Sequence, residues 1–184
     1  MKLNRLTGLW FLLLLQCLFF LPSPAQGAPP YAKGAYGFWP ARTTLSSSTA
    51  SCTPTSYSRR LIENKGVVGI LLTVPWNDAE PANGQFDWTA VRSRLQEAVA
   101  CGLKVTLALS TSLQSTPAWL TARSTATGFS DLGVRLIDLR DYGFAPIFWD
   151  QTFNSYRIRF INDAAVLLQS LPATVLGNVV AVSI

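Results

Sequence analysis

Carboxylates are the main acid–base side chains that this sequence offers. Its 184 residues include 10 Asp and Glu but no His. The lack of histidine excludes Ser-His-Asp catalysis, Cys-His catalysis and histidine metal sites for this polypeptide acting alone. We predict no metal or cofactor site, and we look for chemistry where carboxylates stand beside other polar or aromatic side chains.

Residues 76–88 place acidic, amide and aromatic side chains close together. The segment reads Trp-Asn-Asp-Ala-Glu-Pro-Ala-Asn-Gly-Gln-Phe-Asp-Trp, with Glu80 near its centre. Gly84 permits the positive φ that a loop needs to turn back, Pro81 stiffens the loop, and Asp87 is placed to cap a following helix. The composition is that of a rigid loop that presents polar groups.

This loop lies between a predicted strand and a predicted helix. Residues 67–74 form a continuous apolar run between Gly66 and Pro75, which is typical of a strand buried on both faces. Apolar positions then recur at helical spacing up to Cys101, and either Asp87 or Thr89 can cap that helix.

The same alternation extends along the chain. Strands are also predicted at 35–39, 103–109 and 179–184, and helices at 55–64 and 154–171, with a loop over 43–55. Trp149 and Asp150 precede the last helix, where we expect them to cap and pack. Strands that alternate with helices imply right-handed crossovers and a parallel sheet.

Both a doubly wound sheet and a barrel fit this order. No Gly-x-Gly-x-x-Gly or Walker-type loop follows a strand, whereas the connections over 75–86 and 110–153 are long and aromatic-rich. We therefore predict an α/β fold that is a partial (β/α)8 TIM barrel, with roughly the first four strands and three helices.

The segment 76–88 also carries a family resemblance. Its pattern, W-x-x-x-E-P-x-x-G-x-[FY]-D-[FW], resembles the loop after the second strand of clan A glycoside hydrolases, most closely the family 42 and family 35 β-galactosidase-like enzymes. The order of later motifs is similar too: residues 98–107 resemble the next helix-to-strand return, 116–120 the P-x-W-L after the third strand, and 146–150 the entry to the third helix. The similarity covers residues 67–184.

The resemblance implies an oligosaccharide or polysaccharide as the binding partner. Trp76 and Trp119 would stack on the apolar face of a pyranose, with loop packing as the alternative for both, while Asn77 and Glu80 would take hydroxyl groups. For Glu80, anchoring of loop backbone amides is the favoured alternative, because loop carboxylates commonly bond to nearby amides.

No catalytic residue can be named in this chain. Retaining enzymes of this clan use two carboxylates about 5 to 5.5 Å apart, and the resemblance places them at the ends of the fourth and seventh strands. Because Ile184 lies inside the fourth strand, we expect an N-terminal fragment of a glycoside hydrolase that is inactive alone. A half barrel also leaves unpaired edges, so a second polypeptide that completes the barrel is an alternative, as is a degraded gene product.

The first 27 residues have the features of a secretory signal peptide. Lys2 and Arg5 precede an apolar run of about 13 residues, which is too short to cross a bilayer, and small residues follow it. We therefore predict a secreted or periplasmic domain over 28–184, with no membrane partner after cleavage. Its 13 basic and 10 acidic residues are scattered, so no nucleic-acid partner is indicated.

Two cysteines, Cys52 and Cys101, remain after cleavage. In the predicted barrel, Cys52 would lie near the C-terminal ends of the strands and Cys101 at the opposite side. A ten-residue helix separates these sides by about 15 Å, whereas a disulfide needs Cα atoms within about 7 Å. We expect the two cysteines to stay unpaired.

A second function remains open on the sequence alone. A noncatalytic carbohydrate-binding or surface-interaction protein would keep the aromatic loop and lack the carboxylates. The DNA sequence after codon 184 would distinguish the two functions. A reading frame that continues with a Glu within a few residues favours the enzyme, and a stop codon favours the noncatalytic protein.

Overall fold

The computed structural model describes residues 35–39, 52, 59, 63, 66–125, 127–140 and 143–184. All of them belong to the second of two units into which contacts divide the chain, Ala32–Ile184. The predicted signal peptide, the loop over 43–55 and most of the predicted helix over 55–64 lie outside the described residues. Among the helices that are described, none has the length and apolar character needed to cross a membrane.

Four parallel strands form the main sheet, and their order in the sheet is their order in the chain. They are β1 (Ala35–Trp39), β2 (Val67–Pro75), β3 (Lys104–Ser110) and β6 (Val179–Ser183). All four predicted strands are therefore confirmed. Gly102, with a φ of +74°, forms the tight return from α4 into β3.

Two long helices pack on the sheet. They are α4 (Thr89–Ala100) and α6 (Gln151–Gln169), and both agree with the predicted helices to within a few residues. Asp150 caps α6 by accepting a hydrogen bond from the Phe153 backbone N–H at 2.9 Å, as expected. Trp149 does not pack as expected, because its side chain is 80% exposed.

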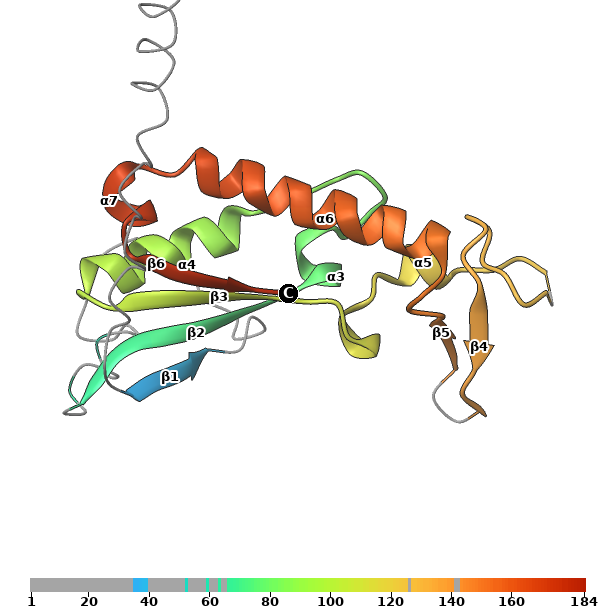
Figure 1. Cartoon of the computed structure of the whole chain (residues 1–184), viewed down its shortest axis with the longest axis horizontal. Coiled ribbons are helices and arrows are strands. Elements are labelled where there is room, and N and C mark those ends of the chain that lie inside the picture. Colours follow the sequence, from blue (N-terminus) through green and yellow to red (C-terminus); the bar gives the residue numbers. More distant parts are fainter. Residues whose placement is uncertain are drawn as a thin grey trace, which may run out of the picture. The chain divides into compact units, whose positions relative to one another are not determined.

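The two faces of the sheet differ in burial. On the side of α4 and α6, Figure 1 shows helices over the strands, and the side chains there are at most 4% exposed: Ile70, Leu72, Val74, Val105, Leu107 and Leu109. Thr73, Thr106, Ala108 and Ser110 alternate with them and are partly exposed. The prediction that residues 67–74 are buried on both faces is therefore wrong, since no described element covers the second face, which we call the open face.

Residues 110–153 contain more regular structure than the loop that the sequence predicts. After β3 come a 3-10 turn (Leu113–Ser115), the short helix α5 (Ala118–Thr121) and an antiparallel hairpin of β4 (Leu136–Asp138) and β5 (Phe144–Pro146). A last short helix, α7 (Ala173–Leu176), precedes β6. Strands of three residues are too short for their hydrophobic period to be recognised in a sequence.

A disulfide joins Cys52 to Cys101, whose Cα atoms are 5.1 Å apart. The expectation that they stay unpaired is therefore wrong. It placed Cys52 beside the C-terminal end of β1, but twelve residues separate Trp39 from Cys52, and an extended segment of that length can reach roughly 40 Å. Such a segment is long enough to bring Cys52 back to the end of the sheet where Cys101 follows α4.

Candidate functional site

The candidate site lies at the C-terminal end of β2, where the loop over residues 76–88 begins. Its first turn is the short helix α3 (Trp76–Ala79), and Figure 1 shows α3 directly after β2, on the side of the sheet that α6 covers. Parallel strands gather their C-terminal ends at one edge, so this loop and the segment after β3 lie side by side. Loops at such an edge are where α/β proteins commonly bind ligands.

Glu80 is the centre of the loop. Its side chain is fully buried, and both carboxylate oxygens accept hydrogen bonds. Oε2 accepts from the indole N–H of Trp76 at 2.7 Å, and Oε1 accepts from the backbone N–H of Gly84 at 2.8 Å. Gly84 has a φ of +75°, as the sequence predicts. These contacts are those of a carboxylate that closes its own loop.

Arg159 of α6 makes a salt bridge to the same carboxylate. Its Nη2 donates to Glu80 Oε1 and, at 2.8 Å, to Asn83 Oδ1. The guanidinium also lies 5.0 Å from the ring centroid of Tyr156 and 5.7 Å from that of Trp119, within the range of cation–π attraction. Arg159 thereby fastens the loop after β2 to a helix that is 79 residues away in the sequence.

Trp76 is completely buried among aromatic rings. It stacks on Phe160 of α6 with ring centroids 5.4 Å apart and an interplanar angle of 12°. Trp88, at the end of the loop, stacks on the same Phe160 at 5.9 Å and donates its indole N–H to Asp163 at 2.6 Å. Phe160 therefore contacts both ends of the loop, and neither face of Trp76 is open to a sugar in this structure.

Trp119 of α5 is partly buried and meets the loop from the other side. Its indole N–H donates to the backbone carbonyl of Glu80 at 2.9 Å, and its ring contacts Trp76 edge to face at 6.4 Å. The structure thus brings three of the four predicted binding residues, Trp76, Glu80 and Trp119, into one network. Their contacts there anchor the loop; substrate binding by them stays a prediction.

Asn77 lies outside that network. Its Nδ2 donates to the carbonyl of Gln114 at 3.2 Å, while its Oδ1 is buried and has no hydrogen-bond partner in the structure. Close by in the fold, at the end of β3, the hydroxyls of Ser110, Ser112 and Ser115 lie 2.8 to 3.4 Å from one another. Asn77 and these serines supply donors and acceptors that could bind hydroxyl groups at this edge of the sheet.

Arg159 and Asp163 were not predicted from the sequence as residues of this site. A signal for them exists, because residues 156, 159, 160 and 163 recur at the spacing of one helix face. Two charged side chains in an otherwise aromatic stripe indicate that a polar partner lies opposite. The identity of that partner, the loop after β2, could not be read from the spacing.

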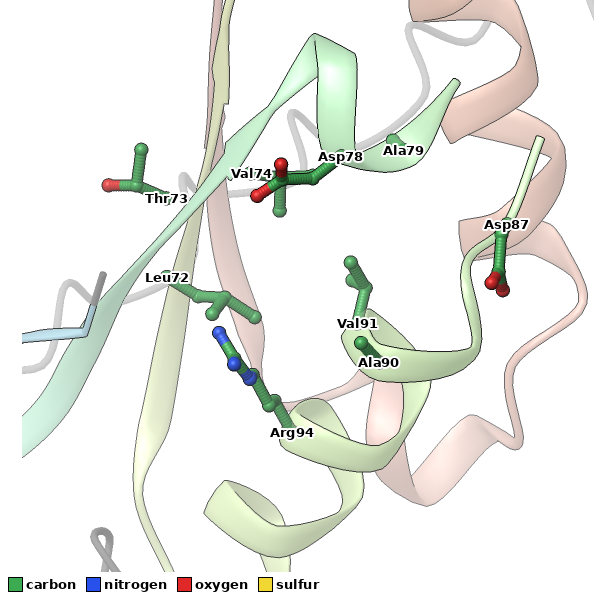
Figure 2. A pocket seen from close by; sticks show the side chains of 9 residues that line it. All are labelled: Leu72, Thr73, Val74, Asp78, Ala79, Asp87, Ala90, Val91 and Arg94. Carbon is green, nitrogen blue, oxygen red and sulfur yellow. The ribbon is translucent and has the colours of Figure 1, made fainter. Parts of the chain in front are cut away.

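A small cavity lies on the other side of the loop, between β2, α3 and α4. Figure 2 shows Arg94 and Val91 of α4 reaching into it, with Asp78 and Asp87 at its rim; its other lining residues are Leu72, Thr73, Val74, Ala79 and Ala90. Burial lowers the pKa of Arg94, and the negative charges of Glu97 and Asp78 offset part of this effect. None of the predicted binding residues lines this cavity.

The titration of Asp87 follows from its position before α4. The backbone N–H of Thr89 donates to Asp87 Oδ1 at 2.9 Å, and this hydrogen bond lowers the pKa of the carboxyl. Asp87 thus accepts from the first turn of the helix, although the cap residue itself is Trp88. Across the described residues, no three His, Cys, Asp or Glu side chains gather in a group able to hold a metal ion.

An α/β chain with a parallel sheet and a loop anchored at its C-terminal edge is the class of protein that these features define. Comparison with known families makes it more specific: the model of glycoside hydrolase family 42, described as beta-galactosidase, matches residues 58–127. That stretch is a family 42-like region and indicates a glycoside hydrolase-like origin. No curated protein matches the chain. The resemblance beyond residue 127 stays a prediction.

Proposed function

We propose that this chain is the substrate-contacting part of a secreted glycoside hydrolase that cleaves O-glycosidic bonds with retention of configuration. The observation that carries the proposal is the family match over residues 58–127. It includes β2, the anchored loop, α4, β3 and Trp119, which are the elements around the candidate site. The substrate is an oligosaccharide or polysaccharide, with a β-galactoside as the first candidate because of the description of the matching family.

The sheet is proposed to be the first four strands of a (β/α)8 barrel. Two observations support this: the strands follow one another in sheet order β1-β2-β3-β6, and α4, α6 and α7 all lie on one face of the sheet (Figure 1). A doubly wound sheet would instead reverse its strand order and carry helices on both faces. In the barrel, the open face with Thr73, Thr106 and Ser110 becomes part of the interior.

The two catalytic carboxylates come from outside this chain in the proposed mechanism. One protonates the glycosidic oxygen as the bond to the anomeric carbon breaks, and the other attacks that carbon to form a glycosyl ester. Water, deprotonated by the first carboxylate, then hydrolyses the ester. Sequence that follows Ile184, or a second polypeptide that completes the barrel, supplies both groups and the remaining strands.

Export to a secreted or periplasmic location is part of the proposal. The apolar leader over residues 1–27 supports it, and so does the disulfide between Cys52 and Cys101, because disulfides persist mainly in oxidising compartments. N-terminal sequencing of the exported protein would test this point. A mature chain that begins at or near Ala28 is the expected result, and a chain that retains its leader in the cytoplasm would contradict it.

A binding and turnover assay tests the function. We expect the full chain to bind β-1,4-galactotetraose in calorimetry and to release no product from p-nitrophenyl β-galactoside. Turnover by the chain alone would contradict the proposed origin of the carboxylates. If neither galactotetraose, cellotetraose nor xylotetraose binds, the substrate-contacting role is wrong.

The alternative is a noncatalytic sugar-binding protein, and one observation favours it: Glu80, the carboxylate at the centre of the loop, is fully buried with both oxygens in hydrogen bonds, so it is not free for catalysis. It shares the expected result of the binding assay, so a second measurement is needed. Sequencing of the transcript past codon 184 separates the two: a frame that soon encodes a Glu and continues supports the hydrolase, and a stop codon supports a noncatalytic sugar-binding protein.

A further inference from the structure

Trp149 is the most exposed tryptophan among those whose side chains the structure describes. The structure describes the side chains of four tryptophans, of which Trp76 and Trp88 are buried and Trp119 is partly buried, whereas Trp149 is 80% exposed. Within the described part of the chain, no aromatic ring or cation packs on the indole of Trp149. Single exposed apolar side chains are common on protein surfaces, but an indole held on an ordered turn offers a flat apolar face that can stack on a ligand.

The backbone that carries Trp149 is held on both sides. The N–H of Asp150 donates to the carbonyl of Ile147 at 2.9 Å, which closes a turn with Trp149 in it. The side chain of Asn154 donates to the carbonyl of Phe148 at 3.1 Å, and the Phe148 ring packs edge to face on Phe153 at 5.7 Å. The buried Asp150 carboxylate caps α6 and completes the support.

A ring mounted in this way loses little backbone entropy when a ligand binds, because the turn is already ordered. The exposed indole can take the C–H face of a pyranose, and its N–H can donate to a hydroxyl. The exposed side chain of Gln151 follows at the start of α6 and offers an amide for hydroxyl groups. The start of α6 lies with α5 beyond the C-terminal ends of β2 and β3 (Figure 1). The helix α3, which contains Asn77, directly follows β2.

We propose that Trp149 is a stacking platform for a sugar unit of the oligosaccharide substrate. This inference rests on the proposed function and assigns to Trp149 the stacking role that the sequence analysis gave to Trp76 and Trp119. We propose a sugar and not a protein surface as the occupant, because the family match indicates a glycoside hydrolase-like origin. Phe148, which precedes Trp149, is also 48% exposed, so the test includes protein association as an outcome.

Calorimetric titration of the full chain with β-1,4-galactotetraose, cellotetraose and xylotetraose tests the platform. Trp149→Ala should weaken binding of the best probe about tenfold, which is the loss expected for one aromatic contact, and Trp149→Phe should restore most of it. Ile158→Ala is the matched control, because it removes an apolar side chain of α6 that is 56% exposed, and it should bind like the wild type.

The outcomes separate the platform from the proposed function. If the wild type binds a probe and Trp149→Ala binds it equally well, the platform is wrong and the proposed function stands. If the wild type binds none of the three probes, both are wrong. If Trp149→Ala and Phe129→Ala both shift the sedimentation coefficient from a dimer to a monomer while sugar affinity is unchanged, the ring belongs to a protein contact and the platform is again wrong.

Discussion

Glu80 shows how a residue of the right chemical type can serve structure instead of reaction. Its carboxylate is fully buried, both oxygens are occupied, and its partners come from the loop, the backbone and α6. The motif around it predicts a rigid loop correctly, and the anchoring role was the favoured alternative. What the motif could not show is Arg159, because the two residues meet only after α6 has packed on the loop.

Glu80→Gln should destabilise the fold by about 3 kcal/mol, the low end for breaking a buried ion pair. The neutral amide cannot hold the Arg159 charge, and it must turn an N–H group toward one of the donors that Glu80 accepts from. Water reaches Arg159 because its side chain is 38% exposed, so the larger values are not expected. Urea unfolding monitored by tryptophan fluorescence measures the change.

The control for that substitution is Glu63→Gln. Glu63 pairs with Arg59 across four residues at 3.6 Å, and both side chains are about half exposed or more. Exposed pairs contribute about 1 kcal/mol or less. Equal losses for Glu63→Gln and Glu80→Gln would contradict the assignment of Glu80 as the buried centre of the loop.

At the scale of elements, the hydrophobic period and the residues that end helices and strands were sufficient to predict the long helices and strands. α4 and α6 were predicted because Val91, Leu95, Phe160 and Leu167 recur at helical spacing, and all four are buried. The hairpin of β4 and β5 was missed, since three residues give no period. The open face of β2 was misjudged because a run of apolar residues does not reveal whether a second layer covers it.

Asp150→Ala should destabilise α6 by about 1 kcal/mol through loss of its N-cap. The Asp150 carboxylate is 8% exposed and accepts from Phe153, so water replaces it poorly. Asp150→Asn keeps an acceptor oxygen and should lose less than half as much. Thermal unfolding followed by circular dichroism measures both variants, and equal losses would show that the charge matters more than the hydrogen bond.

Asp87→Ala should cost about 0.5 kcal/mol at pH 7, because the exposed Asp87 accepts only from the first turn of α4. The folded-state pKa of Asp87 is lowered below its unfolded value. Its contribution is therefore fully present above the unfolded pKa, about 3.9, and is lost as pH falls through the lowered folded pKa. Urea unfolding of both proteins from pH 7 to pH 2 should show the difference vanish at the acid end; a difference that grows on acidification would contradict the assignment.

For the whole molecule, sequence order predicted the strand order but not the long-range covalent link. Cys52 is twelve residues beyond the end of β1 in the sequence, and nothing in the composition of those residues indicates that Cys52 lies beside Cys101. In the described part of the chain, this disulfide links Cys52, in the N-terminal third, to Cys101 at the end of α4. The disulfide matters for stability because the described elements cover just one of the two faces of the sheet.

Cys52→Ser together with Cys101→Ser should lower the free energy of unfolding by about 4 kcal/mol, the chain-entropy value for a loop that spans a sequence separation of 49. The unfolded chain regains the freedom that the bridge removes. Comparison of urea unfolding for the oxidised wild type, the reduced wild type and the double variant measures the loss. The reduced wild type should match the double variant; a reduced protein as stable as the oxidised one would contradict a stabilising role for the bridge.

The exposed edge strand β6 bears on whether the full chain self-associates in solution. Parallel sheets are normally covered on both faces and have few free edges, whereas β6 pairs only with β3 among the described strands and its Val182 is 44% exposed. We expect the full chain to self-associate as its concentration rises, and Val182→Lys to reduce this, because a lysine on an edge strand opposes pairing. Val166→Lys places the same charge at a 62% exposed position on α6 and should leave association unchanged. Sedimentation velocity over a concentration series measures all three proteins; a wild type that stays monomeric throughout would mean that a sheet with one covered face and free edges is sufficient for this chain, and it would remove the main physical argument for a barrel completed by further residues or a second polypeptide.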